Sequence, residues 1–158
     1  MKAEGLVTKR SRFDPEETMT RLEAEVWAKG MTVFVRIDHA AGAAAVALRL
    51  RSTDLLIFGA AKGGTPLMQA AQTIGIDLPL KALVWQDEAG TTFVSYNDPI
   101  WLAQAARSRC GSNACRRGDG ERARRHRGEC GRNVLRYPIR AVTSAPVNHR
   151  TPRTRSLP

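Results

Sequence analysis

Hydrophobic and polar positions alternate with the period of a β-strand near the start of the chain and again over residues 31–38. Residues 6–13, 31–38, 80–86 and 91–96 each predict a strand, and the tight turn over residues 87–90 joins the last two into a hairpin. In the second stretch the alternation places three apolar side chains on one face of a half-buried strand: Val33, Val35 and Ile37. Residues 54–59 contain an unbroken apolar run instead, which is typical of a strand buried on both faces.

A first helix follows the opening strand, because its start and its end are both marked. Asp14 is a suitable N-cap, Pro15 suits the first helical position, and Glu17 completes a capping box. Apolar residues then recur at helical spacing: Met19, Leu22 and Val26. Gly30 provides a left-handed C-terminal stop.

Three further helical segments are indicated. Residues 39–50 are rich in alanine and predict a short, closely packed helix that runs into an extended segment. Thr65 and Pro66 resemble the N-cap and first residue of another helix, which should continue to residue 74. Asp98 and Pro99 repeat this signature and predict a last helix.

Charge divides the chain of 158 residues into two parts. Residues 1–104 hold 11 Lys and Arg against 12 Asp and Glu, a charge of −1, whereas residues 105–158 hold 14 arginines against 3 acidic residues, a charge of +11, which together give the net +10. We therefore predict one folded domain over residues 5–104 and an arginine-rich, disordered tail over residues 105–158. The sequence has no apolar run of about 20 residues and no signal-like N-terminus, so we expect a cytoplasmic protein without a membrane partner.

The tail suggests two kinds of ligand. Its arginines would bind nucleic acid nonspecifically through the phosphate backbone. Four residues loosely match the spacing of a zinc site: Cys110, Cys115, His126 and Cys130. We expect no metal there, because the stretch lacks the apolar anchor of a zinc finger.

Four motifs closely resemble the bacterial family catalogued as domain of unknown function 302. They are FVRIDHAAGAAA (34–45), DLLIFGAAKGGTPLMQ (54–69), IDLPLKALVW (76–85) and SYNDPIWL (95–102), and the likeness covers residues 5–104. The resemblance implies a small α+β domain of the TBP-like (helix-grip) type, in which two or three helices pack on a curved sheet of about five strands. It also implies a homodimer, and no known reaction.

The sequence departs from the family at two places. Ala60 and Ala61 stand where the family usually has Asn-Pro, and Ser52 stands where proline is usual. After Gln104 the family continues with Arg-His-Gly-Leu-Gly and a closing amphipathic helix, which this chain lacks. One choice of codons for residues 105–110 reads Arg-His-Gly-Leu-Gly after deletion of a single base, so we interpret the tail as a frameshift product.

Two groups of residues are candidates for a site at one edge of the sheet. Asp38 could orient His39 as a general base or ligand, although a cap of the next helix is the alternative. Four residues could bind an anion at a helix start, although their order does not match a P-loop and a plain helix entry is the alternative: Lys62, Gly63, Gly64 and Thr65.

A third group brings a phenol, an amide and a carboxylate together at Tyr96, Asn97 and Asp98, where Asp98 could equally be only an N-cap. If His39 belongs to a site, we expect it to lie near the Gly63-Gly64 turn or near Tyr96, since small sheets gather their sites at one edge. The three tryptophans are interpreted as core aromatics: Trp27, Trp85 and Trp101.

The sequence assigns no reaction, catalytic residue or cofactor. We favour a small ligand-binding or stress-associated domain that takes a small-molecule or anionic ligand. A nucleic-acid-binding protein that acts through its arginine-rich tail is the alternative. An enzyme that uses His39 stays open as a third interpretation.

Overall fold

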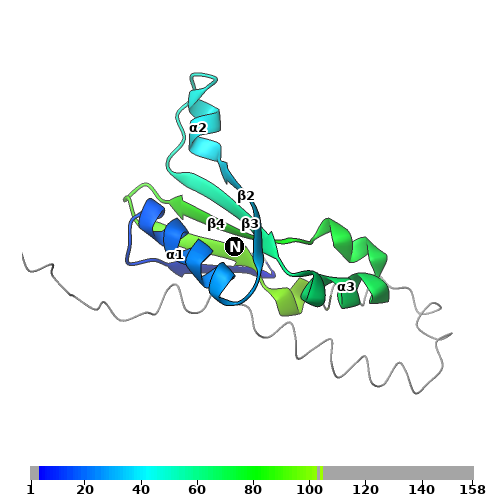
Figure 1. The fold of residues 1–158 in the computed structure, drawn as a ribbon. Helices are drawn as coiled ribbons and strands as arrows, with labels where there is room; N and C mark the ends of the chain where they lie inside the picture. The colour runs from blue at the N-terminus through cyan, green and yellow to red at the C-terminus, as the bar shows by residue number, and fades with distance from the viewer. Residues whose placement is uncertain (1–3, 103, 105–158) are drawn as a thin grey trace, which may run out of the picture.

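The computed structural model describes residues 4–102 and 104, which form one curved antiparallel sheet with helices (Figure 1). The elements are β1 (Leu6–Arg10), α1 (Pro15–Ala28), β2 (Thr32–Asp38), α2 (His39–Ala44), β3 (Thr53–Gly59), α3 (Ala61–Ala70), the 3-10 helix η1 (Gln72–Ile76), β4 (Leu80–Gln86) and β5 (Thr92–Asn97). The five strands lie in the order β1-β5-β4-β3-β2. The predicted α+β class and the predicted number of strands are therefore confirmed.

Helix α1 begins and ends where its sequence signals lie. The Glu17 N–H donates a 2.8 Å hydrogen bond to the Asp14 carboxylate, and Gly30 adopts a φ of +68° after the last turn. The Glu17 carboxylate does not complete the expected capping box within the described contacts. It accepts hydrogen bonds from Arg21, one turn further along the helix, at 2.7 and 3.0 Å.

The hydrophobic core lies between α1 and one face of the sheet. Helix α1 contributes the three apolar residues at helical spacing, and the central strands contribute every second residue. Its fully buried members are Met19, Leu22, Val26, Leu56, Phe58, Ala82, Val84 and Val94. Leu55 and Ile57 face the other way and are only half-buried, so the prediction that this strand is buried on both faces is wrong.

Strand β2 contains a β-bulge that changes which side chains share a face. Val33 pairs with Phe58 on the core face, but Val35 pairs with Ile57 on the opposite face, because the register shifts at Phe34 between them. The prediction that Val33, Val35 and Ile37 lie on one face is therefore wrong. Three side chains of this edge strand are left exposed: Phe34 (57%), Val35 (43%) and Ile37 (37%).

Helix α2 and the loop after it project from one end of the sheet (Figure 1). No residue of α2 is buried, so the predicted close packing of this alanine-rich segment is wrong. The side chains of Val46, Leu48 and Leu50 in the following loop are 49–66% exposed.

Helix α3 begins at Ala61, five residues before Pro66, the predicted first helical residue. Pro66 lies inside the helix instead of at its first position. A proline there removes the N–H that would bond to the carbonyl of Lys62, and the helical segment does not run unbroken to residue 74 as predicted. It is divided into α3 and η1, which end at Ala70 and Ile76.

The hairpin and the last helix start are confirmed. The Gly90 N–H donates to the Asp87 carbonyl at 3.2 Å between β4 and β5. The Asp98 carboxylate accepts a 2.8 Å bond from the Ile100 N–H and caps the helix that begins at Pro99. The Asp98 N–H in turn donates to the Gly5 carbonyl at 2.7 Å, which ties this helix to the start of β1.

Candidate functional site

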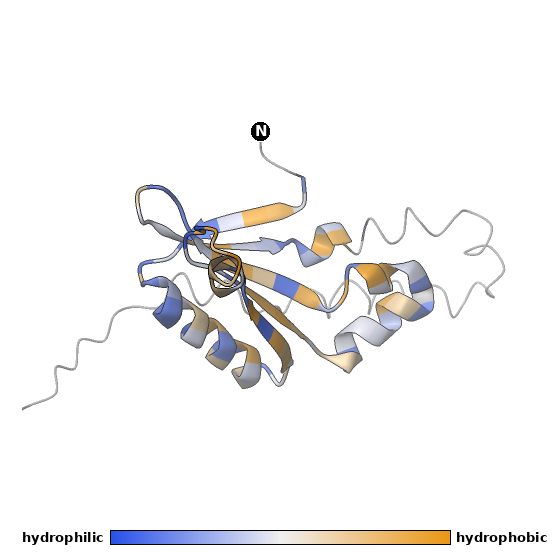
Figure 2. Cartoon of the chain, turned by 90° about the horizontal axis from the view of Figure 1, so that it is seen from above, coloured by the Kyte–Doolittle hydropathy of each residue, from blue (hydrophilic) through white to orange (hydrophobic). Residues whose placement is uncertain are grey.

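The face of the sheet opposite α1 carries three rows of side chains, which we call the open face. The strand register lines up Leu6, Asn97, Lys81, Ile57 and Val35 in the first row, Thr8, Ser95, Leu83, Leu55 and Ile37 in the second, and Arg10, Phe93, Trp85 and Thr53 in the third. Figure 2 shows α1 on one side of the sheet, where its apolar residues form the core, and the central residues of the three rows on the opposite face, such as Lys81, Leu83 and Leu55, are only half-buried. The open face is therefore an accessible and largely apolar surface.

A hollow of about 350 Å³ lies on the open face over β1, β5 and β4. Its walls are formed by Leu6, Thr8, Leu55, Lys81, Leu83, Trp85, Ser95, Tyr96 and Asn97. This volume falls within the range of small-molecule sites, which combine an apolar lining with a few convergent polar groups. The hollow has both features, since leucine side chains alternate with hydroxyl, amide and ammonium groups.

Hydrogen bonds across three strands hold the polar wall of the hollow. The Trp85 Nε1–H donates to Ser95 Oγ at 2.9 Å, and Ser95 Oγ lies 2.8 Å from Thr8 Oγ1. The indole also stacks on Phe93, with ring centroids 5.0 Å apart and an interplanar angle of 25°. The orientation of Trp85 is thus fixed by one hydrogen bond and one aromatic contact.

Lys81 places a cation in the first row of the open face. Its side chain is half-buried, and among the described residues no carboxylate forms an ion pair with it. A lysine in such a place lays its aliphatic stem along apolar surface while the ammonium stays hydrated. The hollow consequently has positive charge at one end and no compensating acid among residues 4–102 and 104.

Asp38 and His39 lie at the opposite end of the sheet from α3. Asp38 pairs with Asp54 at the start of β3, whereas α3 follows Gly59 at the end of β3 (Figure 1). Five residue steps along a strand separate these ends by about 17 Å. The expectation that His39 lies near the Gly63-Gly64 turn is therefore wrong, because β2 and β3 are antiparallel.

His39 does not cap α2 either. The helix is capped by Asp38, whose carboxylate accepts a 2.8 Å hydrogen bond from the Ala41 N–H. His39 is the first residue of the helix and is exposed. Asp38, and not His39, is therefore the residue that caps α2.

The anion-site residues Lys62, Gly63, Gly64 and Thr65 lie within the first turns of α3. The N–H groups of both glycines donate to the Ala60 carbonyl at 3.0 Å. These two donors are engaged in the helix, so the helix-entry alternative describes this segment better than an anion cradle does.

Of the third candidate group, Tyr96 and Asn97 line the hollow and Asp98 does not. The Tyr96 side chain packs against the core, although the residue is also part of the lining of the hollow. Asp98 serves as an N-cap, as its alternative interpretation predicted. Tyr96 and Asn97 are the members of the three predicted groups that the structure brings to the hollow.

Sequence reasoning missed the other polar residues of the hollow, which are Thr8, Lys81, Trp85 and Ser95. The alternation of β4 does place Lys81, Leu83 and Trp85 on one face. It did not reveal the hollow, because the opposite face of β4 is apolar as well. The interpretation of the tryptophans as core aromatics is also wrong. Trp27 is 61% exposed on α1, Trp101 is 37% exposed, and Trp85 lies on the open face.

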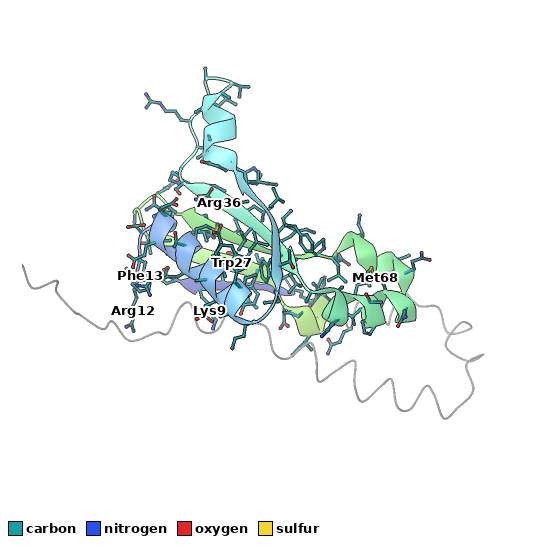
Figure 3. All side chains as sticks on the ribbon, viewed as in Figure 1. Lys9, Arg12, Phe13, Trp27, Arg36 and Met68 are labelled. Atoms are coloured by element: carbon teal, nitrogen blue, oxygen red, sulfur yellow. The ribbon has the colours of Figure 1, made fainter. Side chains whose placement is uncertain are left out.

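A separate ion cluster crosses the core side of the sheet. The Arg36 guanidinium on β2 lies 2.8 Å from the Glu16 carboxylate on α1 and 3.4 Å from Asp54 on β3 (Figure 3). The hydrogen bond from Arg36 lowers the pKa of Glu16, and the same bond raises the pKa of Arg36. This cluster connects α1 to the sheet edge, away from the hollow.

The sequence profile of the family described as Domain of unknown function DUF302 matches residues 7–116. The chain belongs to the DUF302 family. A crystal structure of an uncharacterized conserved DUF302 protein from Bacillus stearothermophilus has the same fold, with a TM-score of 0.61 and 16% sequence identity over 84% of this chain and 94% of that one.

Two curated proteins of Brucella are similar to this chain. The protein named fluoride-specific ion channel FluC 1 of Brucella suis biovar 1 (strain 1330) is 50% identical over 100 residues, which is 63% of this chain and 39% of that protein. Fluoride-specific ion channel FluC 2 of Brucella melitensis biotype 1 is also 50% identical over 100 residues, 37% of its length. The chain thus spans less than two fifths of these relatives.

Within the described residues, no helix is both long and apolar enough to cross a membrane. The same residues contain no group of three or more His, Cys, Asp or Glu side chains arranged to hold a metal ion. The predicted disorder, nucleic-acid binding, frameshift origin and Cys110-to-Cys130 spacing of the tail lie outside the described residues.

Proposed function

We propose that this DUF302 domain is a ligand-binding module that takes a small, partly apolar molecule into the hollow on its open face. The observation that carries this proposal is the hollow itself, with leucines and a fixed tryptophan around a small number of polar groups. Burial of apolar ligand surface against Leu55 and Leu83 would supply the affinity, at about 25 cal/mol per Å².

The relatives support a module of this kind. In the Brucella proteins named fluoride-specific ion channels, the segment similar to this chain makes up 37–39% of a longer protein. A domain that forms part of a longer protein can bind a ligand and so regulate the other part of that protein. We therefore propose a binding role in preference to a reaction.

The test is a titration of the full-length chain with 4-phenyl-1-butanol, a neutral molecule of suitable size, followed by NMR. Saturable shifts at the hollow support the proposal, and Leu83→Gln should weaken binding at least about tenfold. Ile37→Gln is the matched control, because Ile37 lies on the open face outside the hollow and its replacement should leave the affinity unchanged.

Sodium fluoride is the second titrant, because of the name of the relatives. Saturable binding of fluoride without any binding of the alcohol would contradict the proposal. An equal loss of alcohol binding in both variants would contradict it as well, since it would show that the hollow is not the site.

A further inference from the structure

We propose that the ligand of the hollow is a small organic acid whose carboxylate binds between Lys81 and the Thr8–Ser95 hydroxyl pair. The inference rests on the proposed function and specifies the ligand class. It is carried by two independent observations on the open face, one of charge and one of hydrogen-bond donors.

The first observation is the unpaired cation. Lys81 is half-buried beside apolar residues of the first two rows, and no described carboxylate pairs with it. Removal of water from this ammonium by an apolar ligand body would be unfavourable unless the ligand brings a compensating negative charge. An anionic group at this end of the hollow satisfies that requirement.

The second observation comes from a count of hydrogens. The Trp85 N–H donates to Ser95 Oγ, and the contact between Ser95 Oγ and Thr8 Oγ1 uses one of the two hydroxyl hydrogens. Whichever hydroxyl donates in that contact, the other keeps its hydrogen. One hydroxyl donor is therefore left over at the wall of the hollow, with no further partner recorded among the described residues.

The Lys81 ammonium and the spare hydroxyl of the Thr8–Ser95 pair lie close enough to bind the same ligand group. Extending the pairing of Ala82 with Tyr96 by one residue places Lys81 beside Asn97, one row from Ser95. Diagonal neighbours of an antiparallel pair are about 7–8 Å apart, within reach of a lysine side chain. A carboxylate with two oxygens can accept from the ammonium and from the spare hydroxyl together.

The rest of the hollow indicates the shape of the ligand beyond its carboxylate. From the donors, the leucine floor continues through Leu83 to the indole of Trp85 in the third row. Lys81 and Trp85 are four residues apart on one strand, about 13 Å between Cα atoms. An acid with an aromatic or short aliphatic body matches this layout, with its charged end at Lys81 and its apolar end at Trp85.

The test compares 4-phenylbutanoate with its neutral amide, 4-phenylbutanamide, on the full-length chain. We expect the carboxylate to bind at least about tenfold more tightly, since hydrogen bonds to charged groups are the stronger ones. Lys81→Met keeps the aliphatic stem and should reduce this ratio to near one without weakening the amide. Lys62→Met, on the exposed start of α3, is the control and should preserve the ratio.

The outcomes separate the inference from the proposed function. Equal affinities for acid and amide in the wild type, or a ratio that survives Lys81→Met, would overturn the organic-acid assignment while the binding role stands. Failure of the acid, the amide and 4-phenyl-1-butanol alike would overturn both.

Discussion

The indole N–H of Trp85 on β4 donates a 2.9 Å hydrogen bond to the hydroxyl of Ser95 on β5, diagonally across the open face. Ser95 is 8% exposed, so its hydroxyl is a buried acceptor. Ser95→Ala removes that acceptor and leaves the indole N–H unpaired at a half-buried position. We expect a loss of about 1–2 kcal/mol in the free energy of unfolding, measured with urea.

Thr8→Val is the control for this replacement. It removes the outer hydroxyl of the pair but keeps the bond between Trp85 and Ser95. The loss should be smaller, and the NMR signal of the Trp85 indole should stay in place. Equal losses in the two variants would show that the indole bond contributes nothing specific.

A second relationship fixes the start of β1 against the last helix. Gly5 has a φ of +76°, and a methyl group on it would overlap the indole of Trp101. Gly30 also has a positive φ, of +68°, but nothing lies within 4 Å of the same position. Gly30→Ala therefore measures the backbone cost alone, about 1 kcal/mol. Gly5→Ala should lower the free energy of unfolding by at least about 1 kcal/mol more, and equal values would contradict the packing of Trp101 on β1.

The ion pair between Glu16 and Arg36 predicts a pH dependence of stability. Because the folded pKa of Glu16 is lowered below its ordinary 4.5, the pair stabilises the folded state at neutral pH. That contribution is lost as the pH falls below 4.5 and through the folded pKa. The Glu16 side chain is 74% exposed, so the effect is below about 1 kcal/mol.

Urea unfolding of wild type and Glu16→Gln at pH 7 and pH 3 measures this effect. The difference between the two proteins should be largest at pH 7 and smaller at pH 3. Glu23→Gln on the same helix is the control, since Glu23 has no ion pair among the described residues. A difference that grows as the pH falls would contradict the direction of the Glu16 shift.

The strongly marked elements were predictable from the sequence, because their signals are local. The cap at Asp14, the hairpin turn at Gly90 and the cap at Asp98 each depend on contacts within four residues. The start of α3 was not predictable in this way. Thr65 and Pro66 form a good helix-start signal, and the structure overrides it with an earlier start at Ala61.

The open face could not be read from the pattern for a different reason. Leu55, Ile57 and Leu83 are as apolar as the core residues that alternate with them, so the strands appear buried on both faces. Periodicity shows that a face is apolar, but it does not show whether another element covers it. The bulge at Phe34 is hidden likewise, because the residues on both sides of it are valines.

The tail allows a test of the nucleic-acid alternative. Residues 105–158 hold 14 of the 25 basic residues, and six arginines fall between residues 116 and 127. Replacement of these six by glutamine in the full-length chain should weaken binding to duplex DNA and flatten its dependence on salt concentration. Lys62→Gln in the folded part should change neither quantity. If the six-fold variant binds DNA with unchanged affinity and unchanged dependence on salt concentration, these arginines do not contribute to nucleic-acid binding.

The central claim, that a ligand binds in the hollow, is tested most directly by the indole signals of the three tryptophans in a ¹⁵N NMR spectrum of the full-length chain. Trp85 lines the hollow, whereas Trp27 lies on α1 and Trp101 packs on Gly5, and Trp85→Phe assigns the signal of interest. On titration with 4-phenylbutanoate, we expect a saturable shift of the Trp85 indole N–H while the Trp27 and Trp101 signals stay in place. A stationary Trp85 signal at saturating concentration, or a shift confined to Trp27 or Trp101, would contradict it.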